Sequence, residues 1–168
     1  MELFIYIFAA LFSVLNRAAT SMGSRLLRRW LNRPLRDLDL LIGRQDAIAE
    51  LQHNYAFEVF NGILKRVGDM ERILGRLALR SARPRDLSRL LMSVGTYPEL
   101  QNELVHTQSP QLKNLAQQIS TFPDIVDLLS RAIIENPPVV IRDGGVIAEG
   151  YDAELDDLRN ISTNAGQY

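Results

Sequence analysis

The chain contains no cysteine and only two histidines, His53 and His106. Without cysteine it can form no disulfide, thiolate nucleophile or thiolate metal site, which fits a reducing compartment. The histidines lie in unrelated stretches, and neither has a second histidine at the four-residue spacing of a helical metal site. We therefore interpret both as surface or capping residues. Thiol redox chemistry is excluded.

Motifs for covalent catalysis and for nucleotide binding are also missing. No G-x-S-x-G is present, and no trio of nucleophile, base and orienting residue can be grouped. Gly62 and Gly68 flank Lys65, but a phosphate-binding loop requires G-x-x-x-x-G-K followed by Ser or Thr, and Asp69 follows Gly68. We therefore assign no catalytic, cofactor-binding or metal-binding residue, and we expect the chain not to be an enzyme.

The apolar run at the beginning of the chain is too short for a membrane span. It extends from Leu3 to Leu15 with Ser13 as its polar residue. A spanning helix needs about 20 apolar residues. A signal peptide would begin with basic residues, whereas the early charge here is Glu2. Because a helix that is apolar on all sides is usually buried in protein, we predict a buried or partner-covered helix over residues 1–15. A membrane anchor is the less favoured alternative.

Charge is distributed unevenly along the 168 residues, although the formal net charge is only −1. Residues 1–89 carry 15 basic and 9 acidic side chains, a balance of +6, and residues 90–168 carry 4 and 11, a balance of −7. Such asymmetry indicates either a basic surface for nucleic acid, or two halves that attract each other or belong to a larger assembly. We favour the second interpretation. The length itself suits one domain.

Capping residues and prolines predict that most of the chain is helical. Thr20 or Ser21 can cap a helix that ends at Asn32, and Asp37 and Asp69 can each cap a further one. Prolines are favoured in the first helical turn and mark other starts. The expected helices run over residues 20–32, 37–52, 55–67, from 69, from 84, 98–106, 110–120 and 123–135.

Apolar periodicity indicates which helix faces enter a core. On the helix over 37–52, we expect one apolar face to be buried, consisting of Leu38, Leu41, Ile42, Gln45, Ile48 and Ala49. On the helix over 123–135, we expect inward positions at Ile125, Leu128, Leu129, Ala132 and Ile133. A third helix carries an arginine stripe of Arg72, Arg76 and Arg80, which we interpret as a solvated face rather than a phosphate site.

The segment from Pro137 to Asp152 cannot be helical throughout. Two prolines begin it, two short β-branched runs flank Asp143-Gly144-Gly145, and the pattern predicts a β-hairpin at about 139–148. Asp152 can then cap a final helix whose first turns hold the carboxylates Glu154, Asp156 and Asp157, where the helix dipole favours negative charge. The predicted fold class is all-α, a multi-helix array with one short β-hairpin before a C-terminal acidic helix.

Six linked motifs then resemble the core domain of the MutS family of DNA mismatch repair proteins, in the family's order and spacing over residues from about 11 to 164. They are Met22-Gly23-Ser24-Arg25-Leu26-Leu27-Arg28-Arg29-Trp30-Leu31, Pro34-Leu35-Arg36-Asp37, Arg44-Gln45, Gly68-Asp69-Met70-Glu71-Arg72-Ile73-Leu74, Arg83-Pro84-Arg85-Asp86-Leu87, and Arg142-Asp143-Gly144-Gly145-Val146-Ile147 followed by Gly150-Tyr151 and Glu154-Leu155. Upstream of about Leu11 the sequence departs from the family pattern.

The resemblance implies that the chain is the helical core, or lever, domain. In the family this domain lies between the mismatch-reading domains, the DNA clamp and the ATPase, and it transmits the nucleotide state of the ATPase to the clamp that holds DNA. We expect residues 1–15 to form an apolar helix atypical of the family. Residues 16–168 should form the core domain, truncated at the start of the lever helix that begins at Asp152. The full-length family uses ATP and Mg²⁺, but the ATPase and mismatch-reading motifs are missing here. No family active-site or base-reading residue can be carried over, and we expect no cofactor.

Two functions remain open. The favoured one is a non-catalytic structural and relay domain whose partners are other domains of a MutS-family protein, with only weak, non-specific DNA binding of its own. The alternative is a free-standing helical nucleic-acid-binding module that uses the basic N-terminal half. We also expect a cytoplasmic location, no membrane partner, and a capacity to form homo-oligomers through exposed apolar helix faces.

Overall fold

The computed structural model describes the backbone of residues 2–165 and the side chains in that range except those of 2–5, 54 and 165. The described part is all-α, and none of its residues is in a named β-strand. Its elements are α1 (Glu2–Leu15), α2 (Ser21–Asn32), α3 (Leu38–Gln52), η1 (His53–Tyr55), α4 (Ala56–Leu64), α5 (Met70–Ala78), α6 (Pro84–Gly95), α7 (Tyr97–Val105), α8 (Pro110–Gln118), α9 (Pro123–Ala132), η2 (Ile141–Asp143) and α10 (Ala153–Ala165).

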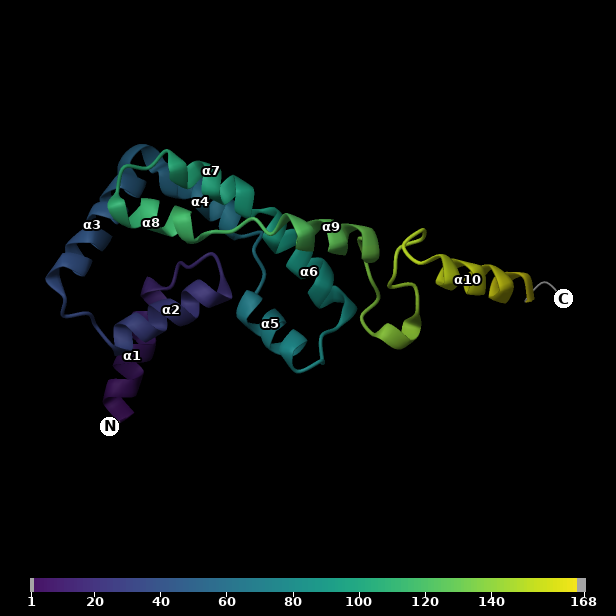
Figure 1. Cartoon of the computed structure of the whole chain (residues 1–168). Helices are drawn as coiled ribbons and strands as arrows, with labels where there is room; N and C mark the ends of the chain where they lie inside the picture. Colours follow the sequence, from purple (N-terminus) through teal and green to yellow (C-terminus); the bar gives the residue numbers. More distant parts are fainter. Residues whose placement is uncertain (1, 166–168) are drawn as a thin grey trace.

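The helices form an elongated array (Figure 1), and its buried residues make two separate cores. Helices α3, α4, α7 and α8 pack around one core, which contains Ala47, Leu104, Leu112 and Ala116. Helices α5, α6 and α9 pack around the other, which contains Val67, Met70, Ile73, Leu90, Val94, Leu129, Ala132, Ile133 and Val146. The near-continuous pair α6 and α7 connects the two groups, while α1 and α10 lie at opposite ends of the array.

The helix starts follow the predicted caps. The Thr20 side chain accepts a hydrogen bond from the Gly23 amide at 2.9 Å, and the Asp37 carboxylate accepts one from the Leu40 amide at 3.1 Å. These bonds satisfy amides that have no partner within the helix. Three prolines, Pro84, Pro110 and Pro123, are the first residues of α6, α8 and α9, as predicted.

The predicted hairpin at 139–148 is wrong. Residues Ile141–Asp143 form a single 3₁₀ turn, and the described part has one isolated antiparallel bridge, between Ile133 and Ile147. The side chain of Ile141 is 76% exposed, whereas Val146 is buried in the core beside Ile133. Burying the second apolar run therefore outweighs pairing it with the first run.

Backbone bonds attach this segment to the end of α9. The Ile134 amide donates to the Val146 carbonyl at 3.1 Å, and the Ala148 amide donates to the Ala132 carbonyl at 2.9 Å. The segment after Gly145 is thus an extension of the second core.

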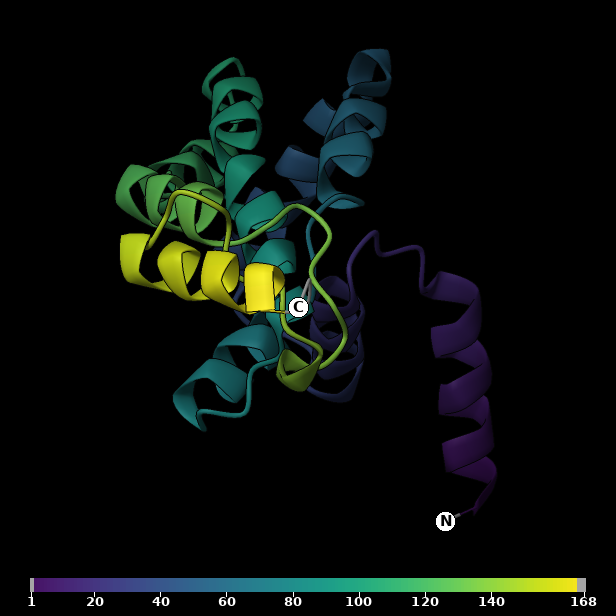
Figure 2. The same ribbon diagram turned by 90° about the vertical axis from the view of Figure 1, so that its right-hand side faces the viewer.

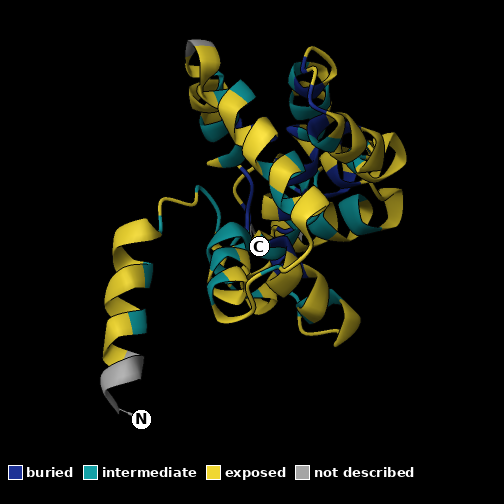
Figure 3. Cartoon of the chain, turned by 90° about the vertical axis from the view of Figure 1, so that its left-hand side faces the viewer, coloured by how far each residue is buried: buried dark blue, intermediate teal, exposed yellow. Residues whose placement is uncertain are grey.

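Helix α1 stands apart from the bundle (Figures 2 and 3). Tyr6 is 73% exposed and Val14 is 68% exposed. Among its described side chains, the Phe12 ring contacts the array, with the Arg28 guanidinium 4.5 Å from its centre. Burial of this helix within its own chain was therefore a wrong prediction, whereas covering by a partner stays a prediction. No helix in residues 2–165 combines the length and apolar character needed to cross a membrane.

Two predicted core faces differ from the observed ones. On α3, Leu38 and Ile48 are exposed and Ala47 is buried instead. Ala47 and Leu51 pack into the first core from this other side of α3, and Glu50 beside them accepts a bond from the Ser109 amide at 2.6 Å. On α9 the predicted inward positions Leu129, Ala132 and Ile133 are buried, but Ile125 and Leu128 are exposed.

Candidate functional site

The most strongly connected polar site joins α2 to α5. Arg25 donates from Nη1 to Asp69 Oδ2 at 2.8 Å and from Nη2 to Asp69 Oδ1 at 2.6 Å, which is a bidentate pair. Its Nε also donates to Glu71 Oε2 at 2.8 Å. One guanidinium on α2 therefore holds two carboxylates of the first turn of α5, in the planar geometry that favours arginine over lysine.

Asp69 has a second role at this site. Its side chain caps α5 by accepting a bond from the Arg72 amide, and only 19% of the side chain is exposed. The hydrogen bonds from Arg25 lower the pKa of the Asp69 carboxyl, and the bond from the Arg72 backbone acts in the same direction. The hydrogen bonds to Asp69 and to Glu71 raise the pKa of Arg25. Both groups are thus held in their charged forms.

Gly68 allows this capping residue to lie close to α6. The Gly68 amide donates to Ser93 Oγ at 2.8 Å, and Ser93 Oγ donates to the Arg89 carbonyl at 2.7 Å. Ser93 is fully buried. A Cβ atom at position 68 would lie 2.7 Å from Arg89 Cγ and 3.2 Å from Ser93 Oγ, so any other residue here would force these side chains to move.

A second junction joins α5 to α6. Arg76 Nε donates to Asp86 Oδ2 at 2.8 Å, and the same carboxylate oxygen accepts from the Arg83 amide at 2.9 Å. The hydrogen bond from Arg76 lowers the pKa of the Asp86 carboxyl. The arginine stripe is therefore not one solvated face, since Arg76 is engaged between helices and Arg80 lies beyond the end of α5. Arg72, with 71% of its side chain exposed, and Arg80, which is also exposed, match the prediction.

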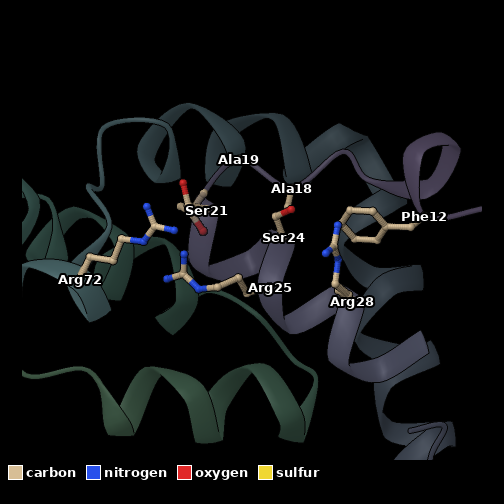
Figure 4. Close-up of a pocket in the computed structure, with 9 residues that line it drawn as sticks. Phe12, Ala18, Ala19, Ser21, Ser24, Arg25, Arg28 and Arg72 are labelled. Carbon is tan, nitrogen blue, oxygen red and sulfur yellow. The ribbon is translucent and has the colours of Figure 1, made fainter. Parts of the chain in front are cut away.

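An open cavity of about 510 Å³ lies above the first junction, between α1, α2 and α5 (Figure 4). Arg25 and Arg72 point toward it from α2 and α5, and Arg28 lies against the Phe12 ring on its other side. Its remaining lining comes from small residues around the start of α2. The cavity is therefore basic, with its charge partly neutralised by the two carboxylates bound to Arg25.

The described side chains do not fit the ATP and Mg²⁺ of the full-length family. Among them, no group of three or more His, Asp or Glu residues could hold a metal ion. The glycines with positive φ are Gly144, Gly145 and Gly150, and none begins a phosphate-binding loop followed by Lys and Ser or Thr. The cavity lining includes no carboxylate that could bind Mg²⁺.

Three of the residues that form the two junctions, Arg25, Asp69 and Asp86, come from the sequence motifs at 22–31, 68–74 and 83–87, and Arg76 follows the second motif by two residues. A sequence model of one family, described as MutS domain III, matches residues 8–167. The chain belongs to the MutS domain III family. In this MutS domain III chain the motifs at 22–31 and 68–74 contact each other directly, because Arg25 of the first binds Asp69 and Glu71 of the second.

Sequence reasoning identified the motif segments of the MutS domain III chain but missed two of its contacts. Gly68 was considered for a phosphate-binding loop and as part of a motif, without a packing role, and Ser93 was not singled out. A signal for Ser93 was present, since it occupies an apolar position between Leu90 and Val94 at helical spacing. A small polar residue at a core position predicts a specific buried hydrogen bond.

Proposed function

We propose that this chain is a non-catalytic structural and relay domain that couples ATPase state to DNA clamping within a MutS mismatch repair protein. The observation that carries the proposal is the pair of junctions, Arg25 with Asp69 and Arg76 with Asp86, which connect α2 to α5 and α5 to α6. Its partners are the other domains of such a protein.

Bidentate ion pairs at helix ends suit a relay for a physical reason. Their geometry is directional, so a rotation of α2 shifts the capping carboxylate of α5, and the second junction passes the shift to α6. Helix α6 packs against α9, and α9 is bonded to the segment that leads into α10. A continuous path of packed helices and charged bonds thus runs along the array.

A second candidate function is nucleic-acid binding by the basic half. Its support is that the side chains of Arg29, Arg33 and Arg36 have no carboxylate within 4.0 Å among the described side chains, and that Arg72 is largely exposed. Among the ion pairs of the described part, only the one between Arg66 and Glu99 joins the basic half to the acidic half. Mutual attraction of the halves therefore explains little of the charge asymmetry.

Anisotropy titrations with DNA distinguish the two functions, and calorimetry with ATP tests the non-catalytic part of the relay proposal. A relay domain should show no saturable ATP binding, and it should bind matched and mismatched duplexes equally weakly, with an affinity that falls steeply as salt increases. A free-standing binder would retain tight binding at physiological salt and lose it when Arg29, Arg33 and Arg36 are changed to Ala. Mismatch preference in the isolated chain would also contradict the relay proposal.

A further inference from the structure

Helix α10 leaves the bundle almost alone (Figure 1). Its apolar side chains Leu158 and Ile161 are 58% and 64% exposed, so hydrophobic packing onto the array does little to set its direction. A cavity of about 270 Å³ lies between its first turns and the segment that precedes it. The direction of α10 must therefore depend on a small number of polar contacts.

Two side chains of α10 make those contacts, one turn apart. The Asp156 carboxylate accepts a bond from the Gly150 amide at 2.7 Å, and Arg159 Nη2 donates to the Ile147 carbonyl at 2.9 Å. Arg159 Nη1 also donates to Asp156 Oδ1 at 3.1 Å, which holds both side chains in place. Only 22% of the Asp156 side chain and 35% of the Arg159 side chain are exposed.

The backbone that receives these contacts is itself anchored. Its neighbours Val146 and Ala148 are bonded to the end of α9, and Val146 is buried in the second core. Gly150 has φ of +79°, a conformation that favours glycine and that directs its amide to Asp156. The two side chains therefore connect α10 to a rigid part of the domain.

We propose that Asp156 and Arg159 are positioning residues that clamp α10 at a fixed angle to the bundle. The inference rests on the proposed relay function, because a relay that ends in a helix needs that helix to follow the domain. The clamp has a defined polarity: a carboxylate faces a backbone donor, and a guanidinium faces a backbone acceptor. An ordinary ion pair within one helix would lack this polarity, since exchanging its partners preserves the attraction.

The test is a distance measurement by electron spin resonance on the chain, which has no native cysteine to interfere. Spin labels are attached after Met92→Cys on α6 and Asn164→Cys on α10, both at exposed positions. The parent and the control Asp157→Ala should give one narrow distance distribution. Asp156→Ala and Arg159→Ala should each broaden it and shift its maximum, because α10 then samples several directions.

The charge-exchanged double variant Asp156→Arg with Arg159→Asp separates the clamp from a simple ion pair. The clamp predicts a broad distribution for this variant, because each side chain then faces a backbone group of the wrong polarity. A parental distribution in the exchanged variant, or unchanged distributions in both alanine variants, would overturn the proposal.

Hydrogen exchange of the Gly150 amide gives an independent readout on the same samples. Its protection should be lost in Asp156→Ala and kept in Asp157→Ala, and equal protection in the two would count against the clamp. Circular dichroism verifies that α10 remains helical. None of these measurements requires nucleotide or DNA. A chain with an intact clamp that fails to couple ATP binding to DNA binding would therefore refute the relay proposal but not the clamp.

Discussion

Arg25 and Asp69 lie 44 residues apart in the chain and form a bidentate ion pair that joins α2 to the capped end of α5. Asp69 thereby combines a helix cap with an interhelix contact in one carboxylate. Removing the Asp69 carboxylate should therefore lower stability more than removing the cap or the interhelix contact alone.

Asp69→Ala should lower the free energy of unfolding by at least the cost of a lost N-cap, about 1–2 kcal/mol. Asp69→Asn should lower it less, because the amide oxygen can still cap α5 while the charge is lost. Denaturant titrations followed by circular dichroism measure both values. Equal losses in the two variants would show that the cap contributes nothing beyond the charge.

Acid should weaken both junctions. The pKa values of Asp69 and Asp86 are lowered in the folded chain, chiefly by hydrogen bonds from Arg25 and Arg76. Their stabilisation is therefore fully present above the unfolded-state pKa of about 4, and it is lost as the pH falls through the lower folded-state values. Urea titrations between neutral and acidic pH should show that the free energy of unfolding depends less on pH in the double variant Asp69→Asn with Asp86→Asn than in the parent. Parallel curves for the two proteins would show that Asp69 and Asp86 are not the groups responsible.

Gly68→Ala should destabilise the domain by about 1–3 kcal/mol, the usual cost of overpacking, because the new methyl group would lie 2.7 Å from Arg89 Cγ. Gly62→Ala is the matched control: it lies within α4 and its methyl group would meet nothing within 4 Å. The control should be neutral or stabilising by up to about 1 kcal/mol. Thermal melts that rank the two variants in the opposite order would be incompatible with the close approach at Gly68.

The exposed apolar helix faces predict self-association. On α1 they include Tyr6, Ile7 and Val14, and on α10 they include Leu158 and Ile161. Light scattering coupled to gel filtration should detect a dimer at protein concentrations on the order of tens of micromolar, where apolar interfaces of modest size associate. Leu158→Glu with Ile161→Glu should shift the dimer toward monomer. A monomeric parent would refute this prediction.

Local signals in the sequence determined much of the fold correctly. The caps at Thr20, Asp37 and Asp69 and the starts at Pro84, Pro110 and Pro123 depend on neighbouring residues alone, which is why they could be predicted. Predictions of burial depended on tertiary packing and were less successful. The apolar periodicity of α3 indicated one core face, but the side that carries Ala47 and Leu51 packs into the core instead, and Glu50 on that side bonds Ser109, 59 residues away.

The candidate site shows the same division. Each motif was visible in the sequence, but the pairing of Arg25 with Asp69 and of Arg76 with Asp86 required the relative placement of three helices. The hairpin failed for a similar reason, because Val146 and Ile147 are β-branched and compatible with a strand, yet their partner is the end of α9.

The relay is tested most directly in a full-length MutS protein whose domain III is replaced by residues 8–167 of this chain. The measurement is the change in mismatched-duplex affinity when ATP is added, followed by fluorescence anisotropy. The account predicts that Arg25→Ala leaves ATP binding and duplex binding intact but reduces the ATP-dependent change, whereas the control Arg29→Ala keeps it. An Arg25→Ala protein whose duplex affinity responds to ATP as fully as that of the unsubstituted chimaera would contradict the account.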